Sequence, residues 1–501
     1  MPAFHMENFG CRAARADGEA VSSRLRAAGL GECVPAKADV VLVNTCSVTA
    51  EAERAARAFI RRAHRVNPNA RIVITGCYAQ RAPQELAAID GVAAVVGNSH
   101  KAFAPGIALS LMGYSAPHIP PAAPRAGGEF IQIQAAEAAS APLQMVWADD
   151  RFAHSFLEEL QLVPGAQTRP NLKIQEGCGN RCAFCVIPQT RGSSRSLSAA
   201  AVLKQVESFV AAGGNELVLS GINLGRWGRD LADPSRGKAL PQGPTVSRPT
   251  LSWLVERIFN QTSLPRLRLS SIEPMDWDGA MIGLMRDFGG TRLARHAHLP
   301  LQSGSDAVLR RMHRRYRPWH YEEKVWALVD AVGPDLTLGA DVMVGFPGET
   351  DAEFEETLAL VRKLPFSYLH LFPFSPRPGT PAWALHAERP VAAKVVKERM
   401  AQLRALSAEK TKAHRVRFVG RELDTITLQT PPELASAGRT AALTENFLPV
   451  ELEGRLAANR LVRVRVSGLN EEEALLAVAC ASDPAQDGFG PAQYNATAMS
   501  V

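Results

Sequence analysis

The sequence predicts a multidomain α/β protein with a small N-terminal parallel α/β domain, a central partial barrel of six β/α units and a small C-terminal antiparallel β-barrel. Within residues 3–105 and 171–406, short β-branched runs alternate with helical stretches, as in parallel sheets. Residues 413–480 are rich in β-branched residues between Gly and Pro turns, as in a small barrel. The 501 residues and 46% hydrophobic content suffice for two or three cores.

The first domain is predicted over residues 1–105. Residues 38–43 and 71–75 are expected to be buried strands, with an amphipathic helix at 51–64 between them. Residues 106–168 lose this alternation and become rich in Ala and Pro, so we predict a linker or an insertion there.

The central domain is predicted over residues 169–411, followed by the β-barrel at 412–480 and a flexible tail at 481–501. The expected central strands are 172–175, 216–220, 266–270, 296–300, 337–344 and 368–373. A charged helix at 391–412 leads into the last domain, where residues 461–466 alternate Arg with apolar residues as a half-buried strand would.

Composition and sequence pattern indicate the cellular compartment of the protein more clearly than its binding partner. The excess of 56 Lys+Arg over 50 Asp+Glu is mild, and it suits a polyanion without identifying one. We find no signal-peptide pattern and no apolar run near the roughly 20 residues that span a bilayer, so we expect a cytoplasmic protein without a membrane partner. Thiols stay reduced there, so the eight cysteines are predicted to be metal ligands or reactive groups rather than disulfides.

Three of these cysteines form a compact motif, C-x3-C-x2-C, made by Cys178, Cys182 and Cys185 directly after a predicted strand. A structural zinc site would need a fourth ligand nearby, and none follows. A [4Fe–4S] cube held by three thiolates keeps one iron free for a ligand. The alternative, three small apolar core residues, is disfavoured by the spacing, the flanking glycines and the reducing compartment.

With Phe184 before its last cysteine, this motif resembles that of the radical S-adenosylmethionine superfamily. The resemblance implies that the free iron binds S-adenosylmethionine, and that an electron then splits a carbon–sulfur bond to give methionine and a 5′-deoxyadenosyl radical. In a parallel barrel the ligand lies at the carboxyl ends of the strands. The residues expected there to contact the cofactor are Phe184, Ser220, Gly221, Asn223, Ser271, Glu273, Gln302 and Asp341.

A second set of cysteines follows successive predicted strands of the first domain: Cys11, Cys46 and Cys77. Because parallel strands end at one edge of a sheet, these thiols are expected to meet and to hold a second cluster. Cys33 and Cys480 lack such a setting and are predicted to be structural.

Several motifs together resemble the methylthiotransferase family within that superfamily. They are Phe9-Gly10-Cys11, Asn44-Thr45-Cys46, Thr75-Gly76-Cys77, Val96-Gly97-Asn98, Leu301-Gln302-Ser303-Gly304 and Phe346-Pro347-Gly348-Glu349. Residues 413–480 resemble the family's RNA-binding barrel, called TRAM. The resemblance implies two [4Fe–4S] clusters and two S-adenosylmethionine molecules: one methylates sulfur on the second cluster, and the other activates a carbon–hydrogen bond of the acceptor.

Family members differ in their acceptor. The motifs Gly76-Cys77-Tyr78-Ala79-Gln80 and Ser270-Ser271-Ile272-Glu273-Pro274 look most like the branch that converts N6-threonylcarbamoyladenosine, next to the tRNA anticodon, to its 2-methylthio derivative. Ala14 departs from the family, which usually has Asn at this position. The alternatives are isopentenyladenosine in tRNA, an aspartate of a ribosomal protein and, in another class, a noncatalytic iron–sulfur RNA-binding sensor.

Arginine-rich stretches favour tRNA as the partner, since Arg contacts phosphates and stacks on bases. One set is Arg54, Arg57, Arg61, Arg62 and Arg65 with His64; the other is Arg310, Arg311, Arg314, Arg315 and Arg317 with Tyr316 and Trp319. A solvated helix face is the alternative for both sets. We predict RNA contacts from Arg191, Arg314 and Tyr316. An electron donor such as flavodoxin or ferredoxin is also implied, while the sulfur donor and the catalytic residues stay unassigned.

Overall fold

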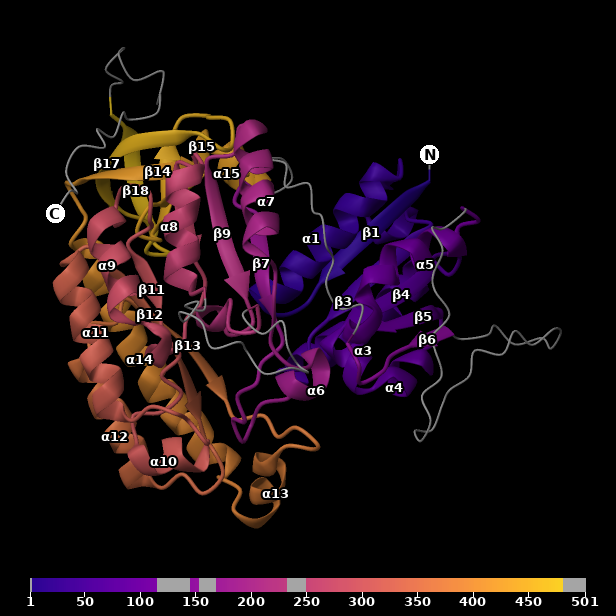
Figure 1. The fold of residues 1–501 in the computed structure, drawn as a ribbon, viewed down its shortest axis with the longest axis horizontal. Coiled ribbons are helices and arrows are strands. Elements are labelled where there is room, and N and C mark those ends of the chain that lie inside the picture. The colour runs from indigo at the N-terminus through magenta and orange to yellow at the C-terminus, as the bar shows by residue number, and fades with distance from the viewer. Residues whose placement is uncertain (1, 115–144, 153–167, 232–248, 481–501) are drawn as a thin grey trace, which may run out of the picture.

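The computed structural model describes residues 2–114, 145–152, 168–231 and 249–480 (Figure 1). The predicted tail at 481–501 and most of the predicted linker lie outside these residues. Three bodies follow along the chain: an N-terminal sheet with its helices, a central arc of strands covered by helices, and a C-terminal barrel. Within the described residues, no helix combines the length and the apolar character that crossing a bilayer would require.

The N-terminal sheet is parallel throughout, with the strand order β2-β1-β3-β4-β5-β6. Every residue of β3 is buried, as expected for a parallel strand covered on both faces. The strands are β1 (Ala3–Asn8), β2 (Gly31–Glu32), β3 (Val40–Thr45), β4 (Arg71–Gly76), β5 (Val92–Gly97) and β6 (Met145–Trp147). The helices are α1 (Arg12–Ala27), η1 (Pro35–Lys37), α2 (Ala50–Val66), α3 (Cys77–Arg81), α4 (Pro83–Ala87), η2 (Asn98–Phe103) and α5 (Ala104–Leu111).

Two details correct the predicted organisation of this region. The boundary at residue 105 falls inside α5, which packs on α1 and on the sheet. Residues 145–147, assigned to the linker, form the edge strand β6 beside β5. A strand of three residues is too short to show a periodicity, so it could not be predicted from the sequence.

Six central strands lie at the predicted positions and form an open arc, and a two-residue strand at 195–196 was not predicted. One sheet has the order β10-β9-β7-β8 and the other β11-β12-β13, with β10 next to β11. The strands are β7 (Asn171–Glu176), β8 (Arg195–Ser196), β9 (Glu216–Gly221), β10 (Arg266–Leu269), β11 (His296–His298), β12 (Thr337–Val344) and β13 (Tyr368–Pro373). The helices are α6 (Ile187–Arg191), α7 (Ala199–Ala211), η3 (Leu224–Arg226), α8 (Leu251–Gln261), η4 (Pro274–Asp276), α9 (Gly279–Phe288), α10 (Asp306–Arg311), α11 (Pro318–Val332), α12 (Asp351–Lys363), α13 (Pro381–Glu388) and α14 (Ala393–Val416).

The C-terminal strands close into the predicted small barrel, in the order β14-β15-β16-β18-β17. All neighbouring pairs are antiparallel except β16 with β18, which is parallel. The elements are β14 (Glu422–Thr427), α15 (Pro432–Ser436), β15 (Arg439–Thr444), β16 (Pro449–Glu453), β17 (Leu461–Leu469) and β18 (Leu475–Ala479). This barrel is tied to the central arc by ion pairs of Arg295 with Glu445 and of Arg421 with Asp335.

Helix α1 joins the first two bodies. It packs on β1 and β3 of its own sheet and, at the same time, on β7 and β9 of the central arc (Figure 1). The carboxyl ends of the N-terminal strands therefore lie beside the loop that follows β7. These are the two places where the sequence predicts cysteine clusters.

Candidate active site

The first trio, Cys178, Cys182 and Cys185, lies in the loop after β7. Burial, with a further contribution from the neighbouring Cys182 and Cys178, raises the pKa of the Cys185 thiol to about 12, so the three thiols lie near one another. N–H groups point at two of the sulfurs. Asn223 Nδ2 lies 3.5 Å from Cys178 Sγ, and Arg314 Nη1 lies 3.4 Å from Cys182 Sγ.

The second trio, Cys11, Cys46 and Cys77, meets at the carboxyl edge of the N-terminal sheet. Gly10, with φ of +113°, allows the close approach, because a Cβ there would lie 2.9 Å from Cys46 Sγ. Burial raises the pKa of Cys46 to about 12, and Cys77 and Cys11 add to the effect in that order. Asn98 Nδ2 donates to Cys77 Sγ at 3.3 Å.

Both trios suit iron–sulfur ligation better than a single ion. All six thiols are free, and N–H donors to cysteine sulfur are the contacts that tune such clusters. Among the described residues, no three His, Cys, Asp or Glu side chains lie close enough to hold one metal ion. A four-iron cube is much wider than one ion, so its ligands must stand further apart than those of a mononuclear site.

A buried charge network joins the two trios, and we define it as Asp17, Lys101, Lys173, Glu176 and Arg191. Arg191 Nε donates to Cys77 Sγ at 3.2 Å, while its Nη1 lies 2.6 Å from Glu176 and 3.1 Å from Asp17. Lys101 Nζ bonds the same two carboxylates at 2.8 and 2.9 Å, and Lys173 bonds both as well. Glu176 stands two residues before Cys178, so the network ties the first cysteine loop to the second trio.

The position of Arg191 corrects one prediction. We expected this side chain to contact RNA, but it is fully buried. Arg314 and Tyr316 are also buried, at 7% and 1% exposure, and Tyr316 donates to Pro300 O or Leu301 O at 2.7 Å. Arg191 is enclosed by the charge network, whereas Arg314 and Tyr316 line a pocket beside Cys182, so none of the three lies on the outer surface. The sequence showed their chemical type but could not show their burial.

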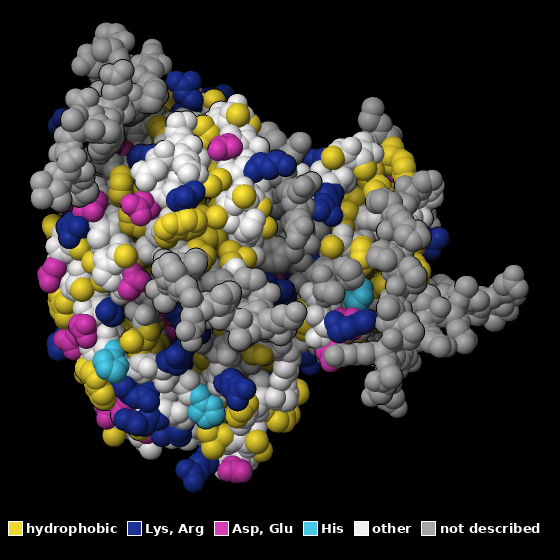
Figure 2. Space-filling model, viewed as in Figure 1, with side chains coloured by type: hydrophobic (Ala, Val, Ile, Leu, Met, Phe, Trp, Pro, Cys, Tyr) yellow, Lys and Arg dark blue, Asp and Glu magenta, His cyan; other side chains and the backbone are white. Residues whose placement is uncertain are grey.

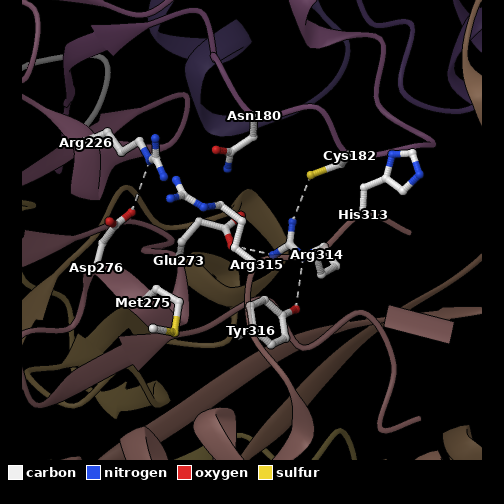
Figure 3. Close-up of a pocket in the computed structure, with 10 residues that line it drawn as sticks. All are labelled: Asn180, Cys182, Arg226, Glu273, Met275, Asp276, His313, Arg314, Arg315 and Tyr316. Carbon is white, nitrogen blue, oxygen red and sulfur yellow. Dashed lines mark hydrogen bonds and ion pairs between the residues drawn. The ribbon is translucent and has the colours of Figure 1, made fainter. Parts of the chain in front are cut away.

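A pocket opens beside Cys182 (Figure 3). Arg314 crosses it, donating to Cys182 Sγ on one side and forming an ion pair with Glu273 on the other. The lining residues are Asn180, Cys182, Arg226, Glu273, Met275, Asp276, His313, Arg314, Arg315 and Tyr316. This arrangement offers carboxylate, amide and guanidinium groups next to the first trio, as a zwitterionic ligand would require.

The predicted cofactor contacts divide into three groups. Glu273 lines the pocket and Asn223 reaches the first trio. Ser220 Oγ and Gln302 Oε1 are buried without a hydrogen-bond partner among the described residues, and Gln302 N donates to Asp341 O at 2.8 Å. The third group, like the second, does not line the pocket. Gly221 pairs with Gln175 on β7, Phe184 packs against the central core, and Ser271 is half-buried.

Several residues of the site were assigned no role in the sequence analysis, although Asn98 belongs to the motif Val96-Gly97-Asn98. Arg226, His313 and Asp276 line the pocket, and Asn98 bonds Cys77. Only for Asn98 could a place near the second trio have been predicted, because it follows β5 at the same sheet edge as these cysteines. The others come from loops and short helices whose approach to the cysteines depends on the tertiary fold.

The two arginine-rich sets behave differently. Arg57, Arg61, His64 and Arg65 of α2 line a surface hollow together with Glu85 and Asp90. In the second set, Arg310, Arg311 and Arg317 are engaged in ion pairs with Asp306 or Glu353, which leaves Arg315 exposed. Lys and Arg side chains also gather in the lower part of the face shown in Figure 2. Basic surface is therefore present, although part of the second set is neutralised.

Asp341 is predicted to titrate near neutrality. Burial, then the nearby Glu273, raises the pKa of Asp341 to about 7. Because this carboxyl has a pKa of about 3.9 in an unfolded chain, the folded protein binds more protons between about pH 4 and 7, and the contribution of Asp341 to stability falls as pH rises across that window. We expect the stability of Asp341→Asn minus that of the wild type to be larger at about pH 8, where the wild-type carboxyl is charged, than at about pH 5, where it is protonated. Urea unfolding at both values measures this, and an unchanged difference would contradict it.

Comparison with known proteins places the chain in a family. Residues 3–97 match the model of the uncharacterized protein family UPF0004, and residues 172–361 match that of the radical SAM superfamily. The threonylcarbamoyladenosine tRNA methylthiotransferase MtaB of Bacillus subtilis is 33% identical over 467 residues, which cover 93% of each chain. The protein of the same name from Aquifex aeolicus is 32% identical, over 92% of this chain and 99% of its own.

A tRNA-2-methylthio-N(6)-dimethylallyladenosine synthase of Sorangium cellulosum is 33% identical, over 88% of this chain and 85% of its own. The matches to these relatives cover 88–93% of this chain. This chain therefore belongs to the radical S-adenosylmethionine methylthiotransferase family.

Proposed function

We propose that this enzyme attaches a methylthio group to carbon 2 of N6-threonylcarbamoyladenosine beside the anticodon of tRNA. The observation that carries the proposal is the pair of cysteine trios joined through Arg191, within a chain that matches two threonylcarbamoyladenosine enzymes along nearly its whole length. Each trio has only three thiolates, which leaves one iron of a cube free for a ligand. The acceptor carbon has neither an acidic proton nor a leaving group, so radical chemistry is required.

In this proposal Cys178, Cys182 and Cys185 hold the cluster that binds S-adenosylmethionine, and Cys11, Cys46 and Cys77 hold the auxiliary cluster. Held by these three thiols, the first cluster would supply the electron for splitting the carbon–sulfur bond of S-adenosylmethionine. Glu273 and Arg314, paired at the pocket wall, orient the ligand, and Asn223 and Asn98 donate N–H groups that offset negative charge on the sulfurs. Asp341, with its raised pKa, is suited to hold a proton near the pocket.

The same proposal covers partners and location. The exposed arginines of α2 and the closed terminal barrel bind the tRNA, a flavodoxin or ferredoxin supplies electrons, and the enzyme works in the cytoplasm. Arg191 is fully buried and Arg314 and Tyr316 line the pocket beside Cys182, so none of the three is part of the outer surface that contacts the RNA in this proposal.

Mass spectrometry of tRNA nucleosides from a deletion strain tests the acceptor. We expect 2-methylthio-N6-threonylcarbamoyladenosine to disappear and its precursor to accumulate, and the gene to restore it. Loss of methylthio-isopentenyladenosine, or of a methylthio group on a ribosomal-protein aspartate, would assign a different acceptor. Unchanged modifications, with no 5′-deoxyadenosine formed by the reduced, reconstituted protein, would indicate the noncatalytic sensor.

A further inference from the structure

The interior of the central arc carries positive charge without enough carboxylates to balance it. Arg169, Arg266 and Arg268 all surround one buried acid, Glu216, at 3.5, 3.5 and 2.9 Å. Arg12, at the start of α1, enters the same region, and none of the described carboxylates lies within ion-pair distance of it. Four guanidinium groups thus face one carboxylate. Such a surplus is costly to bury unless an anion completes it.

Arg12 is held where three parts of the chain meet. It follows Cys11 of the second trio directly, and its guanidinium lies 5.5 Å from the centre of the Phe447 ring, which comes from the C-terminal barrel. Arg268 approaches the same ring at 5.3 Å. Arg12 lies within electrostatic reach of Tyr368 and Glu216, and also of the like-charged Arg268. Stacking on Phe447 fixes the direction of Arg12, and its guanidinium makes no hydrogen bond to any residue that the structure describes.

The walls around this cation are rich in donors. His296 shares a 2.8 Å hydrogen bond with the Tyr368 hydroxyl, and the Tyr368 ring lies over Gly339, where a Cβ would come within 2.1 Å of it. His298 Nδ1 and Arg268 Nη1 are buried and have no hydrogen-bond partner among the described residues. Burial lowers the pKa of His298 to about 3, so its ring is neutral and keeps an N–H to donate.

The region is open as well as polar. His370, which pairs across the sheet with Asp341, is exposed, and the Asp341 side chain is 27% exposed. Solvent therefore reaches this region at β13. Unused donors beside an accessible entrance are the features of a site for an acceptor-rich ligand.

We propose that Arg12, on its Phe447 platform and beside Tyr368 and His298, forms a subsite for a carboxylate carried on the N6 substituent of the acceptor adenosine. The inference rests on the proposed function and deepens it. A threonylcarbamoyl group ends in a carboxylate and a hydroxyl, whereas an isopentenyl group is a hydrocarbon with nothing for a guanidinium to bind. An Arg–carboxylate pair is strong and directional when it is partly buried. Because Arg12 adjoins Cys11, binding there places the adenine beside the second trio.

Binding measurements test the subsite without relying on turnover. The reconstituted full-length enzyme is titrated with three anticodon stem-loop RNAs that carry threonylcarbamoyladenosine, its neutral methyl ester, or isopentenyladenosine. We expect the wild type to bind the carboxylate form about tenfold to a hundredfold more tightly than the ester, as for a charged hydrogen bond. Arg12→Gln is expected to abolish this preference, and Arg12→Lys to retain part of it.

Arg15→Gln is the matched control, since Arg15 lies one turn further along α1 and is exposed. This variant is expected to keep the wild-type preference. Equal weakening of all three RNAs by Arg12→Gln would mean that the guanidinium holds a backbone phosphate, which would overturn the subsite. Wild-type enzyme that forms the methylthio nucleoside but binds acid and ester equally would overturn the subsite alone and leave the proposed function standing.

Discussion

The Cys178→Ala variant is expected to release no 5′-deoxyadenosine from S-adenosylmethionine, whereas Cys46→Ala is expected to keep this cleavage and to lose transfer of the methylthio group. The reason is structural. The first trio lies in the loop after β7 and the second on the edge of the N-terminal sheet, and the two share no sulfur. Removing one thiolate from a three-ligand site leaves that cluster with only two protein ligands. The other site keeps all three of its thiolates.

Liquid chromatography with mass spectrometry measures both products, 5′-deoxyadenosine and the methylthio nucleoside, in reduced and reconstituted enzyme. Cys33→Ala serves as the control, because Cys33 belongs to neither trio and its thiol donates to the Val34 carbonyl at 3.4 Å. It should match the wild type in both assays. If Cys46→Ala abolished cleavage as fully as Cys178→Ala does, the separate roles given to the trios would be wrong.

Replacing Glu176 with Gln is expected to cost about 3–5 kcal/mol of stability, the usual penalty for breaking a buried ion pair. In the buried charge network, Lys101, Lys173 and Arg191 are balanced by Asp17 and Glu176. The variant leaves these three buried cations with one carboxylate. Gln has nearly the same shape as Glu, so the loss reports charge rather than packing.

Urea unfolding at neutral pH measures this loss, with the exposed Glu51→Gln on α2 as the control. Arg191 is the main cause of the depressed pKa of Glu176, and Lys101 and Lys173 add to it. An acid with a depressed pKa stabilises the fold above its unfolded pKa of about 4.3, and this contribution is lost as pH falls from there toward the folded value. The two proteins should therefore converge in acid. A variant that is as stable as wild type at neutral pH would contradict the assigned balance of charge.

The predicted elements agree with the structure where the signal is local. The fully buried β3 and the six central strands were visible as β-branched runs between helical stretches. Strand β6 of the N-terminal sheet lies in the predicted linker and was missed. It has only three residues, too few to show an alternation of apolar and polar side chains. The local sequence therefore predicted the fold class, whereas the short edge strands and the exact ends of the elements depended on pairing with neighbouring strands.

The sequence by itself determined the six cysteines as two sets: the C-x3-C-x2-C spacing groups the first three, and the second three each follow a strand of a parallel sheet, whose strands end at a common edge. It did not determine the surroundings of these cysteines. Arg191 and Cys77 are 114 positions apart, and Arg12 and Phe447 belong to opposite ends of the chain, so no local pattern relates them. Only tertiary packing decided that Arg191, Arg314 and Tyr316 are buried, since burial depends on which distant segments cover a side chain, whereas strand formation depends on the residues next to it.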